Sequence, residues 1–139
     1  MRQASGEIQI STHGKGLIDV TRPLHAWLNE KKVQEGVLTV FIRHSSASLT
    51  IQENADPDVQ LDLADYFERI APESWELYRH NSEGLDDMPA HIRSSLTDVS
   101  LTIPVLDGRM RLGTWQGVYV FEHRASPHIR KLALNFMGE

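Results

Sequence analysis

Titratable side chains are concentrated in one segment, YRHNSEGLDDMPAHIRSSL, residues 78–96. Two histidines enclose three carboxylates there: His80, Glu83, Asp86, Asp87 and His91. Imidazole nitrogens bind divalent metals, and nearby carboxylates accept the second N–H of a ligating imidazole. The histidines are too far apart for an HExxH site, so a shared centre requires the loop to fold back. Charges between two helices are also commonly solvated caps, and that alternative stays open.

Two successive predicted strands each end an apolar row on a group that can do acid–base chemistry. VLTVFIRH, residues 37–44, ends its row on His44, and SLTIQE, residues 48–53, ends its row on Glu53. A histidine in this position is often a core residue that is bonded to a nearby hydroxyl, here Ser45 or Ser46. The alternative is a ligand or an acid–base group at a pocket mouth. The repetition in the second strand favours that alternative.

The segment LGTWQGVY, residues 112–119, is a third candidate. Gly113 and Gly117 permit a bulge or a close approach of the backbone within a β region. Trp115 offers a stacking face, and Gln116 offers a hydrogen-bond donor and acceptor. A kink in a sheet that is packed by an aromatic side chain would explain the same residues.

These candidates are positioned by strands and helices that the pattern predicts. Strands are expected at 7–12, 37–44, 48–53, 100–105 and 117–124, with a turn at Asp107–Gly108 and a final strand after Pro127. A helix follows Thr21, a second one starts at Pro57 with Asp56 as its cap, and a third runs from Met88 to about Thr97 with Asp87 as its cap. The predicted fold class is α+β: one domain, residues 1–139, with a mostly antiparallel sheet or sandwich and two or three helices on one flank.

Composition excludes several classes of function. The chain has 139 residues, 40% of them hydrophobic, and no apolar run approaches a membrane span, so we expect a cytoplasmic protein with no membrane partner. It has no cysteine, which excludes disulfides, thiolate nucleophiles and cysteine-ligated metals. A net charge of −5 without a basic cluster argues against a nucleic-acid partner.

In combination these motifs resemble the YjbQ-like family, a secondary thiamine-phosphate synthase family. The resemblance rests on FIRHSSASLTIQENADPDV, YRHNSEG with DDMPAHIRSSL, and SLTIPVLDGRMRLGTWQGVYVFEHR, and it extends from about Phe41 onward. It implies an α+β fold and a homotrimer with sites near the subunit boundaries. The site positions that it implies are His44, Glu53, Asn54, His80, His91 and Gly113 to Gln116. His123 is kept only as an extra member, because that position varies in the family.

The implied activity is a weak thiamine-phosphate synthase reaction, which joins hydroxymethylpyrimidine diphosphate to thiazole phosphate. A divalent metal on His44, His80 and His91 would bind the diphosphate, with Glu53 or Asp87 orienting an imidazole. We expect Ser45, Ser46, Asn54, Arg79 and the stretch Gly113, Thr114, Trp115 and Gln116 to bind the small phosphorylated metabolite. We assign catalysis to Glu53, Asp87 and His91. Three imidazoles suit Zn²⁺ or a similar ion better than Mg²⁺.

Two alternatives stay open. One is a metal-dependent hydrolase of unknown substrate, with Glu53 as general base. The other is a non-catalytic binder of a small anionic metabolite. The strand 117–124 is apolar on both faces, and we expect the trimer interface to cover one of them.

Overall fold

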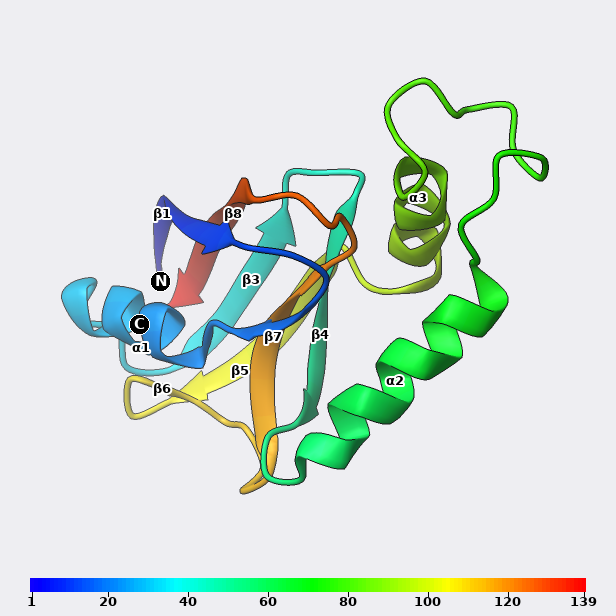
Figure 1. Cartoon of the computed structure of the whole chain (residues 1–139). Coiled ribbons are helices and arrows are strands. Elements are labelled where there is room, and N and C mark those ends of the chain that lie inside the picture. The colour runs from blue at the N-terminus through cyan, green and yellow to red at the C-terminus, as the bar shows by residue number, and fades with distance from the viewer.

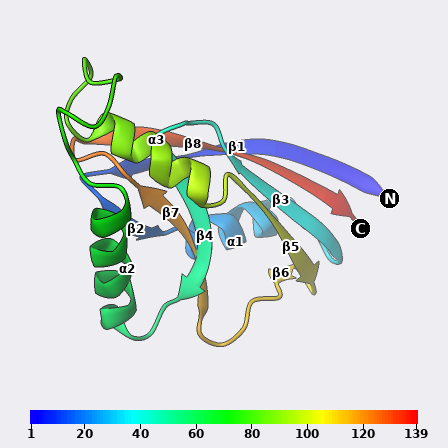
Figure 2. The same cartoon turned by 90° about the vertical axis from the view of Figure 1, so that its right-hand side faces the viewer.

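Two antiparallel sheets pack against each other in the computed structural model, which describes residues 1–139 (Figures 1 and 2). The larger sheet has the strand order β1 (Arg2–Thr12), β8 (His128–Gly138), β3 (Gly36–Ile42), β5 (Ser100–Leu106) and β6 (Arg109–Met110). The smaller sheet has the order β2 (Gly16–Asp19), β7 (Gln116–Glu122) and β4 (Ala47–Glu53). The expected α+β fold with mostly antiparallel sheets is confirmed.

The core lies between the two sheets, and alternation along the strands produces it. Leu38, Val40 and Ile42 of β3 point inward, as do Leu132, Leu134 and Phe136 of β8, as period 2 predicts. They meet residues such as Leu49, Val118 and Val120 of the smaller sheet. The predicted turn at Asp107–Gly108 is also present, with φ values of 54° and 75° that suit a two-residue hairpin.

Strand β7 is buried on both faces, as its sequence predicts, but a helix of the same chain covers the second face. Val118 and Val120 face the core between the sheets. On the other face, Phe121 meets Phe67 of helix α2 (Pro57–Ile70) edge-on, with ring centroids 5.4 Å apart. The expectation that a trimer interface covers this strand was therefore wrong, because α2 provides the cover within one subunit.

The three helices do not share one flank. Helix α1 (Thr21–Glu30) contributes Leu24, Trp27 and Leu28 to the core and lies apart from α2 and α3 (Asp87–Leu96), which stand together on the other side (Figure 1). Asp56 caps α2 and accepts a hydrogen bond from Asp58 N at 2.9 Å, with Pro57 at the first position as predicted. None of the three helices has the length and apolar character that a membrane crossing needs.

Helix α3 begins one residue earlier than the sequence predicts, and this changes the role of Asp87. Asp86 occupies the cap position, while Asp87 is the first helical residue and its side chain is buried. The expectation that Asp87 caps the helix was wrong. Asp86 does not cap the helix through its side chain either, because that carboxylate accepts a hydrogen bond from Ala125 N at 2.7 Å. Both acids are therefore turned toward other parts of the chain.

Candidate metal centre

Asp87 brings two histidines together at the N-terminal end of α3. Its Oδ2 atom lies 2.5 Å from His80 Nε2 and 3.2 Å from His91 Nε2. His91 is one helical turn after Asp87, where residues four apart become neighbours, as the sequence predicts. His80 comes from the loop between α2 and α3, which folds back over the helix. One ligand atom from each of the three residues lies within 4.8 Å of the others, a spacing that a single metal ion can bridge.

The second oxygen of Asp87 is held by an arginine that the sequence analysis did not select. Arg124 follows β7, and its Nη1 atom donates to Asp87 Oδ1 at 2.6 Å. Its Nε donates to Asp86 Oδ2 at 3.2 Å, and its Nη2 donates to the Glu83 carbonyl at 2.9 Å. Asp87 is only 2% exposed, so its charge requires such partners. Nothing in the spacing of the sequence indicates that the end of β7 reaches this loop.

The tautomer of His91 is set by a backbone carbonyl. Its Nδ1 donates to the Ser45 carbonyl at 3.0 Å, which makes Nε2 of the neutral ring a hydrogen-bond acceptor. That Nε2 faces the Asp87 carboxylate at 3.2 Å. Two acceptors repel unless a cation lies between them, either a proton on the ring or a metal ion. A backbone carbonyl on the outer nitrogen is also the usual arrangement for a metal-ligating histidine.

The charges of the cluster favour the ionised carboxylate. The hydrogen bond to Asp87 raises the pKa of His80, and the charges of Asp87 and Glu83 add to that effect. Burial alone would raise the pKa of Asp87, but the hydrogen bond from His80 and the charge of Arg124 outweigh it and lower that pKa. A carboxylate that stays charged near neutral pH suits a cation.

His44 lies outside this cluster and precedes Ser45, whose carbonyl binds His91. Its Nε2 accepts a hydrogen bond from Lys131 N at 2.8 Å, so that nitrogen is already used. Burial lowers the pKa of His44, and the charge of Arg130 lowers it further. The structure therefore groups His80 and His91 with Asp87 and leaves the third predicted ligand apart.

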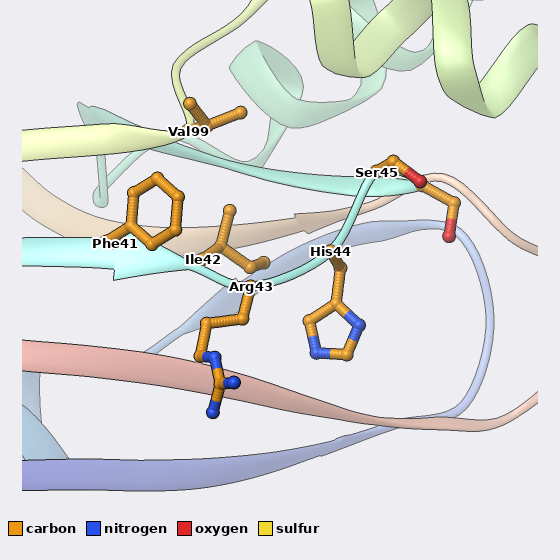
Figure 3. A pocket seen from close by; sticks show the side chains of 7 residues that line it. Phe41, Ile42, Arg43, His44, Ser45 and Val99 are labelled. Carbon is orange, nitrogen blue, oxygen red and sulfur yellow. The ribbon is translucent and has the colours of Figure 1, made fainter.

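An open hollow of about 560 Å³ lies beside His44 (Figure 3). Its lining comes from the end of β3 and the following turn, together with the residue before β5: Phe41, Ile42, Arg43, His44, Ser45, Ser46 and Val99. Ser45 links the hollow to the metal cluster, because its carbonyl binds His91. The Oγ atom of Ser46 accepts a hydrogen bond from the buried Arg130 at 3.0 Å. Arg79 lies exposed on the loop that carries His80.

The remaining predicted site residues lie at the opposite end of the β4–β7 pair. Glu53 pairs with Gln116, whereas Ala47 pairs with Glu122 beside Arg124. The six residue steps from Ala47 to Glu53 span roughly 20 Å at the rise of a β-strand. Glu53 and Trp115 therefore do not reach the histidine cluster of the same chain. A shared role would require a second copy.

Hydrogen bonds hold the turn that contains Trp115. Trp115 O accepts from Asn54 N at 2.9 Å, and Gln116 Oε1 accepts from Gly113 N at 2.8 Å. The side-chain oxygen of Gln116 thus serves the turn itself, and a Cβ at Gly113 would press on it at 3.3 Å. Thr114 is exposed in the same turn, and the Trp115 side chain is 64% exposed. A fixed turn that presents a bare indole fits a stacking surface or an interface.

His123 is a structural residue in this fold. It is 1% exposed and shares a hydrogen bond of 2.9 Å with Ser48 Oγ. Burial, with a smaller effect from Arg93, lowers its pKa to about 3. It is therefore neutral at physiological pH and lies outside the cluster.

The fold and the site together define a small α+β protein of two antiparallel sheets, with a histidine–aspartate–histidine cluster at one end of the smaller sheet. Residues 6–139 match the family model described as UPF0047 protein YjbQ-like. The chain therefore belongs to the YjbQ-like UPF0047 family, and the resemblance seen in its motifs is confirmed.

Relatives and solved structures agree with this assignment. A UPF0047 protein of Synechocystis sp. is 51% identical over 138 residues, which cover 99% of this chain and 94% of the relative. YjbQ of Salmonella typhimurium is 46% identical over 107 residues, 77% of each chain. A YjbQ/UPF0047-family crystal structure from Clostridium acetobutylicum superimposes with a TM-score of 0.85 at 35% identity, covering 94% of this chain and 98% of the other.

Proposed function

We propose that the protein is an enzyme that uses a divalent metal held by His80, Asp87 and His91 to act on a small phosphorylated metabolite. The observation that carries the proposal is the contact geometry of His91. Its Nδ1 meets the Ser45 carbonyl at 3.0 Å, so in the neutral ring Nε2 carries the lone pair and faces the Asp87 carboxylate at 3.2 Å. A metal ion at that point would satisfy the imidazole and the carboxylate together.

The donor set determines which metals fit. Two imidazoles and one carboxylate oxygen suit Zn²⁺ or a similar borderline ion, whereas Mg²⁺ prefers oxygen ligands and keeps several waters. Bound there, such an ion supplies positive charge for phosphate oxygens and acidifies a bound water. The chain itself orients both rings through Asp87 and the Ser45 carbonyl.

The hollow beside the cluster supports a phosphorylated ligand. Because His44 Nε2 accepts the N–H of Lys131, the neutral ring carries its proton on Nδ1 and can act as a donor. The hydroxyl of Ser45 lines the same space. These uncharged donors offer hydrogen bonds to an anionic oxygen within a chain whose net charge is −5, and Arg43, which also lines the hollow, is ion-paired with Glu7 at 2.9 Å.

The specific reaction that we propose is weak synthesis of thiamine phosphate from hydroxymethylpyrimidine diphosphate and thiazole phosphate. Loss of diphosphate leaves positive charge on the pyrimidine methylene, so the site must neutralise the leaving group and stack the ring. Trp115 is the exposed aromatic available for stacking. Since it lies roughly 20 Å along the sheet from Glu122, it would act on the cluster of a neighbouring copy in a homotrimer.

A metal-dependent hydrolase is the second candidate, and the imidazole-rich donor set favours it. Ions of the Zn²⁺ type generate a nucleophilic hydroxide near neutral pH. Glu53 cannot be the general base within one chain, because it lies at the other end of β4. His80, Asp87 and His91 would all be used as ligands, so Glu53 of a second copy would have to act as that base.

The test compares wild-type protein with His91→Ala and with His13→Ala, a control on an exposed histidine outside the cluster. Protein purified without added metal or an affinity tag is examined by elemental analysis and titrated with Zn²⁺. Both substrates are then supplied, and thiamine phosphate is measured. We expect one metal per chain and turnover in wild type and in the control, and loss of both in His91→Ala while the melting temperature changes little.

Different results separate the candidates. Metal binding with phosphatase turnover and no thiamine phosphate would favour the hydrolase. Saturable binding of the phosphorylated compounds without turnover would indicate a binding protein. Equal Zn²⁺ affinity in wild type and His91→Ala would overturn the proposed metal centre.

A further inference from the structure

Arg124 binds three acceptors around the cluster at once. Its guanidinium donates to Asp87 Oδ1, to Asp86 Oδ2 and to the Glu83 carbonyl at 2.6, 3.2 and 2.9 Å. The adjoining Ala125 N also donates to Asp86 Oδ2, at 2.7 Å. The planar fork therefore joins the end of β7 to the loop that carries His80 and to the first turn of α3.

This arrangement divides the two oxygens of Asp87 between different partners. Oδ1 faces the guanidinium, and Oδ2 alone faces both imidazoles. A carboxylate that bound a metal through both oxygens would have to place the metal in competition with Arg124 for Oδ1. Because Asp87 is 2% exposed, water cannot readily replace that bond.

We infer that Arg124 is a positioning residue that makes Asp87 a one-oxygen ligand and so restricts the centre to metals that accept three protein donors. The inference rests on the proposed metal centre and goes beyond it by naming what sets metal choice. Ions that seek many oxygens, such as Ca²⁺, often take both oxygens of a carboxylate. Zn²⁺ binds readily to three protein donors with an open position for water or substrate.

An alternative is that Arg124 only neutralises the negative charges of Asp86 and Asp87. Any cation at this position would then be enough, and Arg124→Lys would behave like wild type. A lysine ammonium keeps the charge but cannot make three bonds in one plane to two carboxylates and a carbonyl. The lysine variant therefore separates positioning from charge.

The experiment measures Zn²⁺ and Mn²⁺ dissociation constants by calorimetry for wild type, Arg124→Lys and Arg69→Lys. Arg69 is exposed on α2, where its guanidinium lies 5.9 Å from the ring centroid of Tyr66, so it serves as the control. We expect Arg124→Lys to weaken Zn²⁺ binding about 10–100-fold, the usual effect of losing such a supporting contact. The preference for Zn²⁺, measured as the Mn²⁺ dissociation constant divided by the Zn²⁺ dissociation constant, should also fall, because Asp87 can then offer both oxygens to Mn²⁺. Wild-type constants in Arg124→Lys would overturn the inference.

A measurement without metal keeps the inference separate from the metal centre. Imidazole nitrogen shifts of His80 and His91 report the contacts that each ring makes with Asp87. We expect both sets of shifts to change in Arg124→Lys and neither to change in Arg69→Lys, with unfolding curves showing that each variant is folded. Unchanged shifts in Arg124→Lys would overturn the positioning role even if Zn²⁺ binds. Absence of Zn²⁺ binding in wild type would overturn the metal centre instead.

Discussion

At the scale of single residues, backbone groups decide what the histidines can do. Four histidines use a backbone atom to fix one ring nitrogen. His91 donates to the Ser45 carbonyl and His128 to the Ser126 carbonyl, whereas His44 accepts from Lys131 N and His25 accepts from Met110 N. Of these, only His91 directs its other nitrogen at a carboxylate, which is why it is assigned to the candidate centre.

The low pKa of His123 predicts how the free energy of unfolding depends on pH. Its folded-state pKa of about 3 lies below the ordinary value of 6.5, so the unfolded chain binds the proton more readily. Its contribution to stability is complete above pH 6.5 and is lost as the pH falls toward 3. Below the unfolded-state pKa, the free energy of unfolding falls by about 1.4 kcal/mol for each pH unit. The total loss between pH 7.5 and 5 is about 2 kcal/mol.

Urea unfolding of wild type and His123→Gln checks this prediction. Glutamine can keep a hydrogen bond to Ser48 but does not titrate. We expect the free energy of unfolding of wild type to fall more steeply between pH 7.5 and 5 than that of the variant. Parallel curves would show that His123 is not the group responsible.

At the scale of elements, α2 has the clearest energetic role. It covers one face of β7 chiefly through Phe67, which is 8% exposed and meets Phe121 edge-on. Its neighbours on the helix, including Leu61 and Tyr66, are largely exposed. The attachment of α2 therefore depends on few side chains.

Phe67→Ala should lower the free energy of unfolding by about 3–5 kcal/mol, the usual cost of deleting a buried aromatic ring. Tyr66→Ala removes a ring of similar size from the exposed side of the same helix and should cost less than about 1 kcal/mol. Denaturant unfolding with circular dichroism measures both variants. Equal losses in the two variants would mean that α2 does not cover β7 in solution.

At the scale of the whole molecule, the outer face of the larger sheet is the surface best suited to assembly. Apolar side chains on this face are between 37% and 45% exposed: Val37, Phe41, Leu106 and Met137. Val37 and Met137 are opposite each other in the register of β3 and β8. Contiguous exposed apolar side chains on a sheet commonly mark an interface. We therefore propose that the subunits of the homotrimer contact each other through this face and not through β7.

Light scattering provides the test of assembly. Wild type should have about three times the chain mass of 15.8 kDa, whereas the double variant Val37→Lys with Met137→Lys should dissociate because lysines on one sheet face repel and resist burial. Leu61→Lys, on the exposed side of α2, serves as a control that should keep the wild-type mass. A folded wild-type monomer at micromolar concentration would contradict the trimer.

Elements with local signals can be predicted from the amino-acid sequence. Apolar alternation predicts the buried rows of β3 and β8, and Asp56 with Pro57 predicts the start of α2. The spacing of Asp87 and His91 likewise predicts their contact, because residues four apart meet on any helix. These features depend on neighbours in the chain, so a single sequence is enough to predict them.

Contacts between segments that are distant in the chain become known only from the packed fold. The register of β4 against β7 puts Glu53 and Ala47 at opposite ends and so separates Glu53 from the histidines. The same pairing delivers Arg124 to Asp87, although 37 positions separate them in the chain. Such contacts follow from how the sheets and helices pack, and the residue types alone carry no signal for them.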